Sequence, residues 1–146
     1  MHFITGGAFN GKKTWVKNHY KLETLEYLWL SAYKNDSLVK TADSKHPPIV
    51  ILEGMEKWIS NNVTSNKTTA SILIELQDRL NSWIKWEKQS EQHRLLIIGT
   101  DISKGIVPTE QQDRHWRDIT GWMYQYIAKQ SSHMDVIWYG INQRIK

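Results

Sequence analysis

One short glycine-rich turn restricts the possible folds of this chain more than any other feature. Residues 6–12 read Gly-Gly-Ala-Phe-Asn-Gly-Lys, which satisfies the pattern GxxxxGK. The turn follows a short β-prone run, His2 to Thr5, and precedes a segment from about Lys12 to Tyr20 that predicts a helix. Small residues at this spacing let successive backbone N–H groups point inward around an anion, and the following helix adds its positive end. The sequence therefore predicts a phosphate-binding loop (P-loop) between a strand and a helix.

The residues of this turn predict a site for a nucleoside triphosphate, either GTP or ATP. Lys12 is expected to span the outer phosphates. The next position usually carries Ser or Thr, whose hydroxyl ligates Mg²⁺, but this chain has Lys13 there and a hydroxyl one residue later at Thr14. Lys13 either replaces part of the lost positive charge or is a solvent-exposed helix residue, and the sequence leaves both open. The expected nucleotide-binding residues are Gly6, Gly7, Ala8, Asn10, Gly11, Lys12, Lys13 and Thr14.

Acidic residues follow two continuously apolar runs that predict buried strands. Ile49 to Leu52 ends in Glu53, and Leu95 to Ile98 runs into Gly99-Thr100-Asp101. Ligands of parallel α/β sheets bind beyond the carboxyl ends of the strands, so residues 6–13, 53–56 and 100–104 are the segments of interest. We expect Glu53, with Thr14, to hold Mg²⁺, and Lys12, Glu53 and Asp101 to be catalytic. The alternative for Glu53 is a solvated strand end or a cap for the next helix.

The remaining pattern predicts an α/β fold, with a three-layer, P-loop NTPase-like parallel sheet and helices on both faces. Apolar positions at three- and four-residue steps predict a helix from Thr68 to about Lys88. Leu25 to Ala32 is a second strand or a short buried helix, with strand favoured. The other expectations are a mobile loop or insertion at Tyr33–Pro48, a helix after a capping box of Thr109 and Gln112, and a final strand at Val136–Tyr139. We expect one domain over residues 1–146.

Composition excludes several classes of site. The chain has no cysteine, so thiolate metal sites, disulfides and cysteine nucleophiles are excluded. The net charge of +4 suits an anionic partner, but the basic residues are scattered, so we expect no nucleic-acid face. No apolar run approaches the ~18 residues that span a bilayer, and Met1 to Gly7 is no signal peptide, so we expect no membrane partner and a cytoplasmic location. Trp83, Trp116 and Trp122, three of eight tryptophans, are expected in core or subunit packing.

Several motifs resemble those of one known family. Gly6 to Lys12, Thr100 to Pro108, and Arg114 to Gln125 are similar to the patterns GGARSGKS, NEVGxGIVP and RxFRDxxGxxNQ of the bacterial adenosylcobinamide kinase/adenosylcobinamide-phosphate guanylyltransferase family. Ile49 to Asn61 resembles the family segment VLVDCLTLWLSN. The resemblance covers about two thirds of the chain. Arg117, Asp118 and Gly105 match the pattern without an assigned role.

The resemblance implies an enzyme of cobalamin biosynthesis. Such a P-loop kinase transfers phosphate from GTP or ATP to the aminopropanol side chain of adenosylcobinamide. Members of the family are typically homotrimers, which makes a homotrimer a possible assembly for this chain. The family then transfers GMP through a guanylylated histidine, which lies in a longer segment with a pattern like HRxxRPxxWxTxE. This chain has no such run, and His46 is followed at once by Pro47-Pro48. The resemblance therefore implies the kinase half without the guanylyltransferase half.

Two other functions remain open from the sequence. Lys13 and the shortened middle segment favour a non-catalytic nucleotide-binding or regulatory relative of the same family. Tryptophan and lysine side chains would also suit a binder of single-stranded nucleic acid, for which only the bulk charge argues.

Overall fold

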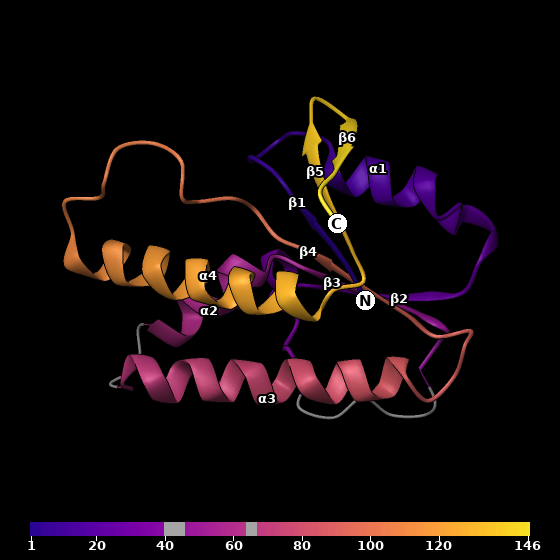
Figure 1. The fold of residues 1–146 in the computed structure, drawn as a ribbon, viewed down its shortest axis with the longest axis horizontal. Helices are drawn as coiled ribbons and strands as arrows, with labels where there is room; N and C mark the ends of the chain where they lie inside the picture. The colour runs from indigo at the N-terminus through magenta and orange to yellow at the C-terminus, as the bar shows by residue number, and fades with distance from the viewer. Residues whose placement is uncertain (40–45, 64–66) are drawn as a thin grey trace.

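A six-stranded sheet forms the centre of the molecule, with its strands in the order β2-β3-β4-β1-β5-β6 (Figure 1). The computed structural model describes residues 1–39, 46–63 and 67–146. Within this part, the elements are β1 (His2–Thr5), α1 (Lys12–His19), β2 (Tyr27–Ser31), β3 (Ile49–Glu53), α2 (Met55–Val63), α3 (Thr69–Glu87), β4 (Arg94–Ile98), α4 (Gln111–Gln130), β5 (His133–Trp138) and β6 (Ile141–Arg144). Short 3-10 turns lie at Leu22–Thr24 and Ala32–Lys34.

Helices cover both faces of the sheet, so the predicted three-layer α/β architecture is confirmed. In Figure 1, α1 lies on one side of the sheet and α2, α3 and α4 lie on the other. Two separate cores reflect this arrangement. Val16 of α1 packs on Ile51 and Leu96, whereas Trp83 of α3 belongs to a larger cluster with Leu95. Among the described residues, α1 is the one α-helix on its face of the sheet, and it begins at the glycine-rich turn.

The strands with continuous apolar sequence lie where the prediction placed them. β1, β3 and β4 pair in parallel, and their apolar residues are buried because helices cover both faces. The segment 25–32, for which strand was favoured over helix, contains β2 (Tyr27–Ser31), which lies at the edge of the sheet and pairs in parallel with β3. The long helix is also confirmed, and the Thr68 side chain caps it by accepting a hydrogen bond from the Ser71 N–H at 3.3 Å. The carboxyl ends of β1, β3 and β4 therefore meet at one edge.

The sheet is mostly parallel, as predicted, but the strand predicted at Val136–Tyr139 has different bounds and is not the last strand. β5 begins earlier, at His133, and a further strand, β6, pairs with it antiparallel. Tyr139 and Gly140 form the two-residue turn between them with φ values of 49° and 82°, as in a type I′ hairpin. All four residues of β6 are exposed, and the Arg144 guanidinium anchors the strand by donating to Asp135 at 2.8 Å. A strand with no buried face leaves no hydrophobic pattern to detect.

The predicted capping box at Thr109 and Gln112 is also wrong. α4 begins at Gln111, with Glu110 as its N-cap residue and no side-chain cap. The Arg114 guanidinium instead donates to the carbonyl oxygens of Pro108 and Thr109. An arginine from the first turn therefore satisfies the backbone that precedes the helix.

The three tryptophans expected in packing have different environments. Trp83 is fully buried, and Trp116 packs on the same core while partly exposed. Trp122 is 48 % exposed on α4, so it does not belong to the core. In the described part of the chain, no helix is both long and apolar enough to cross a membrane.

Candidate functional site

The glycine-rich turn connects the carboxyl end of β1 to the first residue of α1. Gly6 has φ 140°, and a Cβ there would collide with the backbone carbonyl of Ile137 on the neighbouring strand. Gly11 has φ 84°, and a Cβ there would lie 3.2 Å from the Cα of Gly140. Both positions require glycine because the loop runs directly beside β5 and the turn that follows it.

The Lys12 side chain folds back across this loop. Its Nζ donates to the carbonyl oxygens of Gly6 at 3.1 Å and Gly7 at 2.7 Å, and the residue is buried. Burial lowers the pKa of Lys12 below its usual value of 10.5, while the carboxylates of Glu56 and Glu53 oppose that shift. The ammonium group therefore lies inside the loop at the N-terminus of α1, where it would contact an anion bound to the loop amides.

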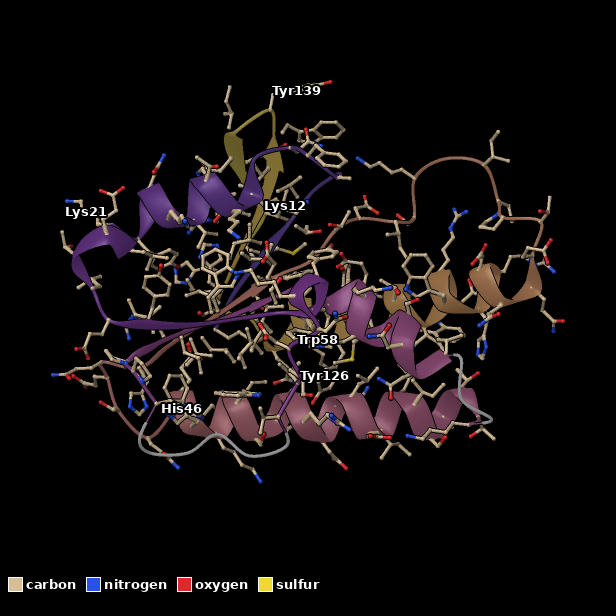
Figure 2. All side chains as sticks on the ribbon, turned by 180° about the vertical axis from the view of Figure 1, so that it is seen from behind. Lys12, Lys21, His46, Trp58, Tyr126 and Tyr139 are labelled. Carbon is tan, nitrogen blue, oxygen red and sulfur yellow. The ribbon has the colours of Figure 1, made fainter. Side chains whose placement is uncertain are left out.

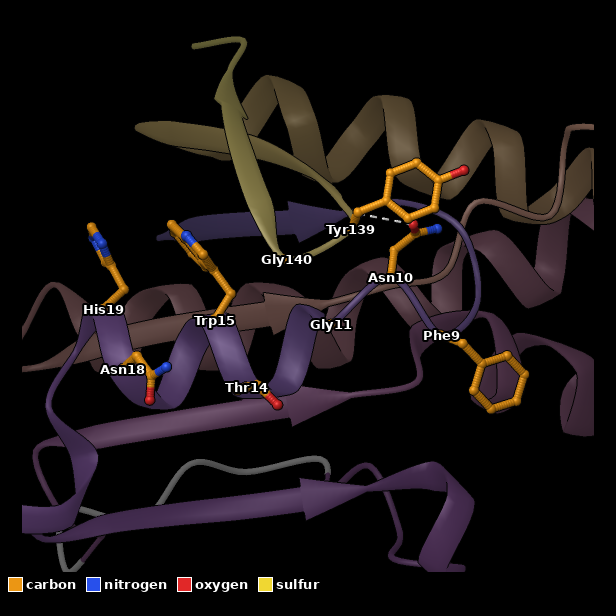
Figure 3. Close-up of a pocket in the computed structure, with 9 residues that line it drawn as sticks. All are labelled: Phe9, Asn10, Gly11, Thr14, Trp15, Asn18, His19, Tyr139 and Gly140. Carbon is orange, nitrogen blue, oxygen red and sulfur yellow. Dashed lines mark hydrogen bonds between the residues drawn. The ribbon is translucent and has the colours of Figure 1, made fainter.

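Phe9 leaves the loop open. It sits at the tip of the turn with φ 58°, and its side chain is fully exposed. Figure 3 shows its ring pointing away from the loop, on the opposite side from Tyr139. An aromatic side chain next to two glycines could have plugged the space between the amides, but here it does not.

Two cavities flank the loop, and residues 9–11 line both. The first has a volume of about 590 Å³, and we call it the acidic cavity after its one described carboxylate, Glu53, which lies there beside Lys12 and Lys13. The second, which we call the aromatic cavity, has a volume of about 580 Å³ (Figure 3). The other residues of the acidic cavity are Ala8, Lys12, Lys13, Tyr33, Glu53, Gly54, Ile98 and Thr100. Those of the aromatic cavity are Thr14, Trp15, Asn18, His19, Tyr139 and Gly140.

The structure brings Lys12, Lys13 and Glu53 together but places Thr14 elsewhere. All three line the acidic cavity, whereas Thr14 lines the aromatic cavity. The Glu53 carboxylate accepts a hydrogen bond from the Trp29 indole at 2.8 Å and lies 3.9 Å from the Lys13 ammonium. That ammonium also lies 5.1 Å from the centre of the Trp29 ring. The hydroxyl and the carboxylate predicted to share a metal therefore face different cavities.

These residues do not fit the Mg²⁺ that the resemblance implies. Mg²⁺ binds oxygen ligands, and a P-loop site supplies a hydroxyl and a carboxylate. Here the position after Lys12 presents an ammonium group, and this group is paired with Glu53. Among the described residues, no group of three His, Cys, Asp or Glu could hold a metal ion.

Glu56 lies in the predicted segment of interest 53–56, but no role was assigned to it from the sequence alone. It is 4 % exposed at the start of α2, and it accepts hydrogen bonds from the Tyr33 hydroxyl and from the Thr100 N–H at 2.9 Å. The Tyr124 hydroxyl lies 3.0 Å from the same carboxylate. Burial and the bond to Glu56 raise the pKa of Tyr33 to about 12, so this phenol stays protonated and donates. Glu56 thus fixes Tyr33 and Thr100, two residues of the acidic cavity, although it does not line that cavity itself.

Asp101 lies beside the loop but is engaged with its own segment. Its carboxylate accepts from the N–H of Ser103 at 2.9 Å and from the hydroxyl of Ser103 at 2.6 Å. Its backbone N–H donates to the carbonyl of Gly6 at 3.0 Å. It lines a different cavity, between β1, β5 and α4. These contacts make Asp101 a support for the loop, and its catalytic role remains a prediction.

His46 lies far from the loop. Its ring packs on Trp83 of α3, with the ring centres 5.3 Å apart, and Figure 2 shows it well separated from Lys12. It lines neither cavity beside the loop. Most of the predicted loop at residues 33–48 can be followed, but residues 40–45 lie outside the described part.

Comparison with known proteins identifies the family. The family model described as CobU, cobinamide kinase / cobinamide phosphate guanyltransferase, matches residues 16–145. The chain therefore belongs to this family, as the resemblance of its motifs indicated. A comparison with the curated proteins found no match. The family match begins at Val16, after the glycine-rich turn, so the geometry of that turn is independent support for a nucleotide-using function.

Proposed function

We propose that this member of the cobinamide kinase family binds a nucleoside triphosphate at residues 6–12 and transfers its terminal phosphoryl group to adenosylcobinamide. The observation that carries the proposal is the position of Lys12. Its ammonium lies inside an open glycine loop, at the N-terminus of α1, and beside a cavity of about 590 Å³ that can admit the aminopropanol arm of the acceptor. Loop amides and the helix end would hold the phosphates, and Lys12 would neutralise the outer ones.

We assign Glu53 as the general base that takes the proton of the acceptor hydroxyl. Among the described residues that line the acidic cavity, it is the only carboxylate. In the proposed step, the acceptor hydroxyl oxygen forms a bond to the terminal phosphorus, and the bond from that phosphorus to its bridging oxygen breaks. The hydroxyl proton passes to the Glu53 carboxylate, and a nucleoside diphosphate leaves.

In this proposal, the Lys13 ammonium supplies positive charge that Mg²⁺ supplies in other P-loop enzymes. Its ammonium is partly exposed at the mouth of the acidic cavity and close to Glu53, so it can approach the terminal phosphate. A fixed positive charge there would offset part of the charge that Mg²⁺ neutralises in other P-loop enzymes. We derive no step through a metal, because the ligands for one are not assembled.

The proposal includes the kinase half of the family's activity only. In the family, guanylyl transfer uses a histidine of the middle segment, and His46 is the candidate for it in this chain. His46 packs on Trp83, on the α3 side of the sheet, and lines neither cavity beside the loop.

A second candidate function is nucleotide binding without turnover. The observation in its favour is that the Glu53 carboxylate already has two partners, the Lys13 ammonium at 3.9 Å and the Trp29 indole at 2.8 Å, which compete with an acceptor hydroxyl for its oxygens. Such a protein would bind GTP or ATP in the same loop and release it unchanged.

Phosphoryl transfer measured directly separates the two. Purified protein is incubated with GTP or ATP labelled in the terminal phosphate, with and without adenosylcobinamide, and the labelled corrinoid is quantified beside a binding titration. The first proposal expects labelled corrinoid from the wild type and from Lys17→Ala, which changes an exposed lysine of the same helix, and none from Lys12→Ala. Binding without label in the corrinoid supports the second candidate, and absence of binding contradicts both.

A further inference from the structure

The two cavities beside the loop are not equivalent with respect to Lys12. This lysine lines the acidic cavity and is absent from the lining of the aromatic cavity. In a P-loop the lysine reaches the outer phosphates, while the glycine-rich backbone holds the inner ones. The terminal phosphate therefore faces the acidic cavity. A nucleotide bound in the loop has to place its nucleoside on the other side, where the aromatic cavity lies.

One face of α1 forms the floor of the aromatic cavity. Gly11, Thr14, Trp15, Asn18 and His19 occupy positions i, i+3, i+4, i+7 and i+8, so they form a continuous stripe that starts at the loop. The Trp15 and His19 rings are stacked, with centres 4.5 Å apart and planes at 14° (Figure 3). This stripe presents flat aromatic surface next to the site of the inner phosphates.

Tyr139 stands at the end of the cavity nearest the loop. It is 87 % exposed and has a φ of 49°, an unfavourable conformation for an aromatic residue. Asn10 of the loop holds this conformation, because its side-chain oxygen accepts from the Tyr139 N–H at 3.1 Å and its carbonyl accepts from the Gly140 N–H at 2.9 Å. Glycine would relieve the strain, and the exposed ring packs on no core. A strained, exposed aromatic fixed to a phosphate-binding loop points to a ligand.

The charge of the aromatic cavity also suits a nucleoside. No carboxylate is among its described lining residues, and the amides of Asn10 and Asn18 can pair with polar edges. Bases of every kind stack on aromatic side chains. We propose that the aromatic cavity binds the base and ribose of the triphosphate through Trp15 and Tyr139. This inference rests on the proposed nucleotide binding at the loop.

Binding titrations with two probes test the inference. ATP carries a nucleoside, whereas inorganic tripolyphosphate carries only the phosphates. The informative variants are Tyr139→Gly, which removes the ring and relieves the positive φ, and Trp15→Leu, which keeps an apolar side chain on the sheet. We expect each variant to weaken ATP binding by roughly tenfold, since a stacked aromatic contributes this much, and to leave tripolyphosphate binding unchanged. Trp122→Leu removes a half-exposed aromatic from α4 and is expected to change neither.

The outcomes distinguish this inference from the function on which it rests. If ATP and tripolyphosphate both bind the wild type, and ATP binds Tyr139→Gly and Trp15→Leu as tightly as the wild type, the nucleoside lies elsewhere and the inference is overturned. If neither probe binds the wild type, the proposed function itself is wrong. If Trp15→Leu alone fails to bind both ATP and tripolyphosphate, that substitution has damaged the loop. The affinities of Tyr139→Gly for the two probes then decide whether the inference stands.

Discussion

The two cavities beside the loop share three residues, yet they differ in chemistry and in how they are built. The acidic cavity is formed at the carboxyl ends of the parallel strands β1, β3 and β4, and two of its polar residues, Tyr33 and Thr100, are fixed by hydrogen bonds to the buried Glu56. The aromatic cavity is formed by one helical face and a hairpin turn, and its aromatic residues range from the partly buried Trp15 to the exposed Tyr139. One side can hold charge in place, and the other offers surface for stacking. The difference suggests that reaction and recognition are separated by the loop itself.

The largest effect is expected from Lys12→Ala. This lysine is the charged group on which both cavities depend, because it fixes which end of the phosphate chain faces which cavity. Loss of its charge-assisted contacts to phosphate should weaken binding of ATP and of tripolyphosphate by about 100-fold or more. Calorimetric titration measures this, with Lys17→Ala as the matched control in the last turn of the same helix. Equal affinity of the Lys12 variant and the wild type for ATP and tripolyphosphate would contradict phosphate binding at the loop.

A smaller effect, confined to the acidic side, is expected from Glu56→Gln. The amide NH₂ group would face donors that now bond to carboxylate oxygen, which leaves a buried donor unpaired. The free energy of unfolding should fall by about 2 kcal/mol, measured by urea denaturation. Glu23→Gln, at an exposed position, is the control and should change stability by less than about 0.5 kcal/mol. Similar stability of both variants would mean that the network around Glu56 does not organise the acidic cavity.

Lys13→Ser tests whether an ammonium group replaces the metal. We expect wild-type affinity for ATP to be nearly the same in Mg²⁺ and in a chelator. In the variant, affinity in the chelator should fall by about tenfold, because one charge-assisted contact to phosphate is lost, and Mg²⁺ should restore part of it. Lys17→Ser is the control. A wild type that loses its affinity on chelation would show that Mg²⁺ binds here and that Lys13 is a bystander.

The smallest effect is the pH dependence of binding. The pKa of Lys12 is lowered by burial, and only its protonated form attracts phosphate. Affinity for ATP should therefore decrease by a few-fold as the pH rises from about 7.5 to 10, before an ordinary lysine with a pKa of about 10.4 would titrate. Lys12→Arg should bind ATP without this decrease, because arginine keeps its charge. A flat profile in the wild type would contradict the lowered pKa.

The parts of the molecule that could be predicted are those with strong local signals. The glycine turn, the apolar runs at β3 and β4 and the period of α3 each depend on neighbouring residues only. β6 could not be predicted, because its Ile-Asn-Gln-Arg sequence has no buried face and depends on Asp135 of the preceding strand. A Gly after Tyr139, between apolar Trp138 and Ile141, was the only hint of the hairpin.

The candidate site shows the same division. Lys12, Lys13 and Glu53 could be predicted to converge because strand ends meet at one edge of a parallel sheet. Glu56 gained no role from the sequence, since its partners Tyr33, Thr100 and Tyr124 come from three distant segments. The aromatic cavity was missed for a related reason, because it forms only when the β5–β6 turn lies beside α1. Thr14 was expected to face Glu53, but one step along a helix turns a side chain by about 100° and places it on the other side of the loop.

The most direct test of the account is a crystal structure with a non-hydrolysable nucleoside triphosphate. We expect the terminal phosphate within hydrogen-bond distance of Lys12 Nζ on the Glu53 side, and the base against Trp15 or Tyr139 in the aromatic cavity. A base found in the acidic cavity, or a nucleotide bound away from residues 6–12, would contradict it.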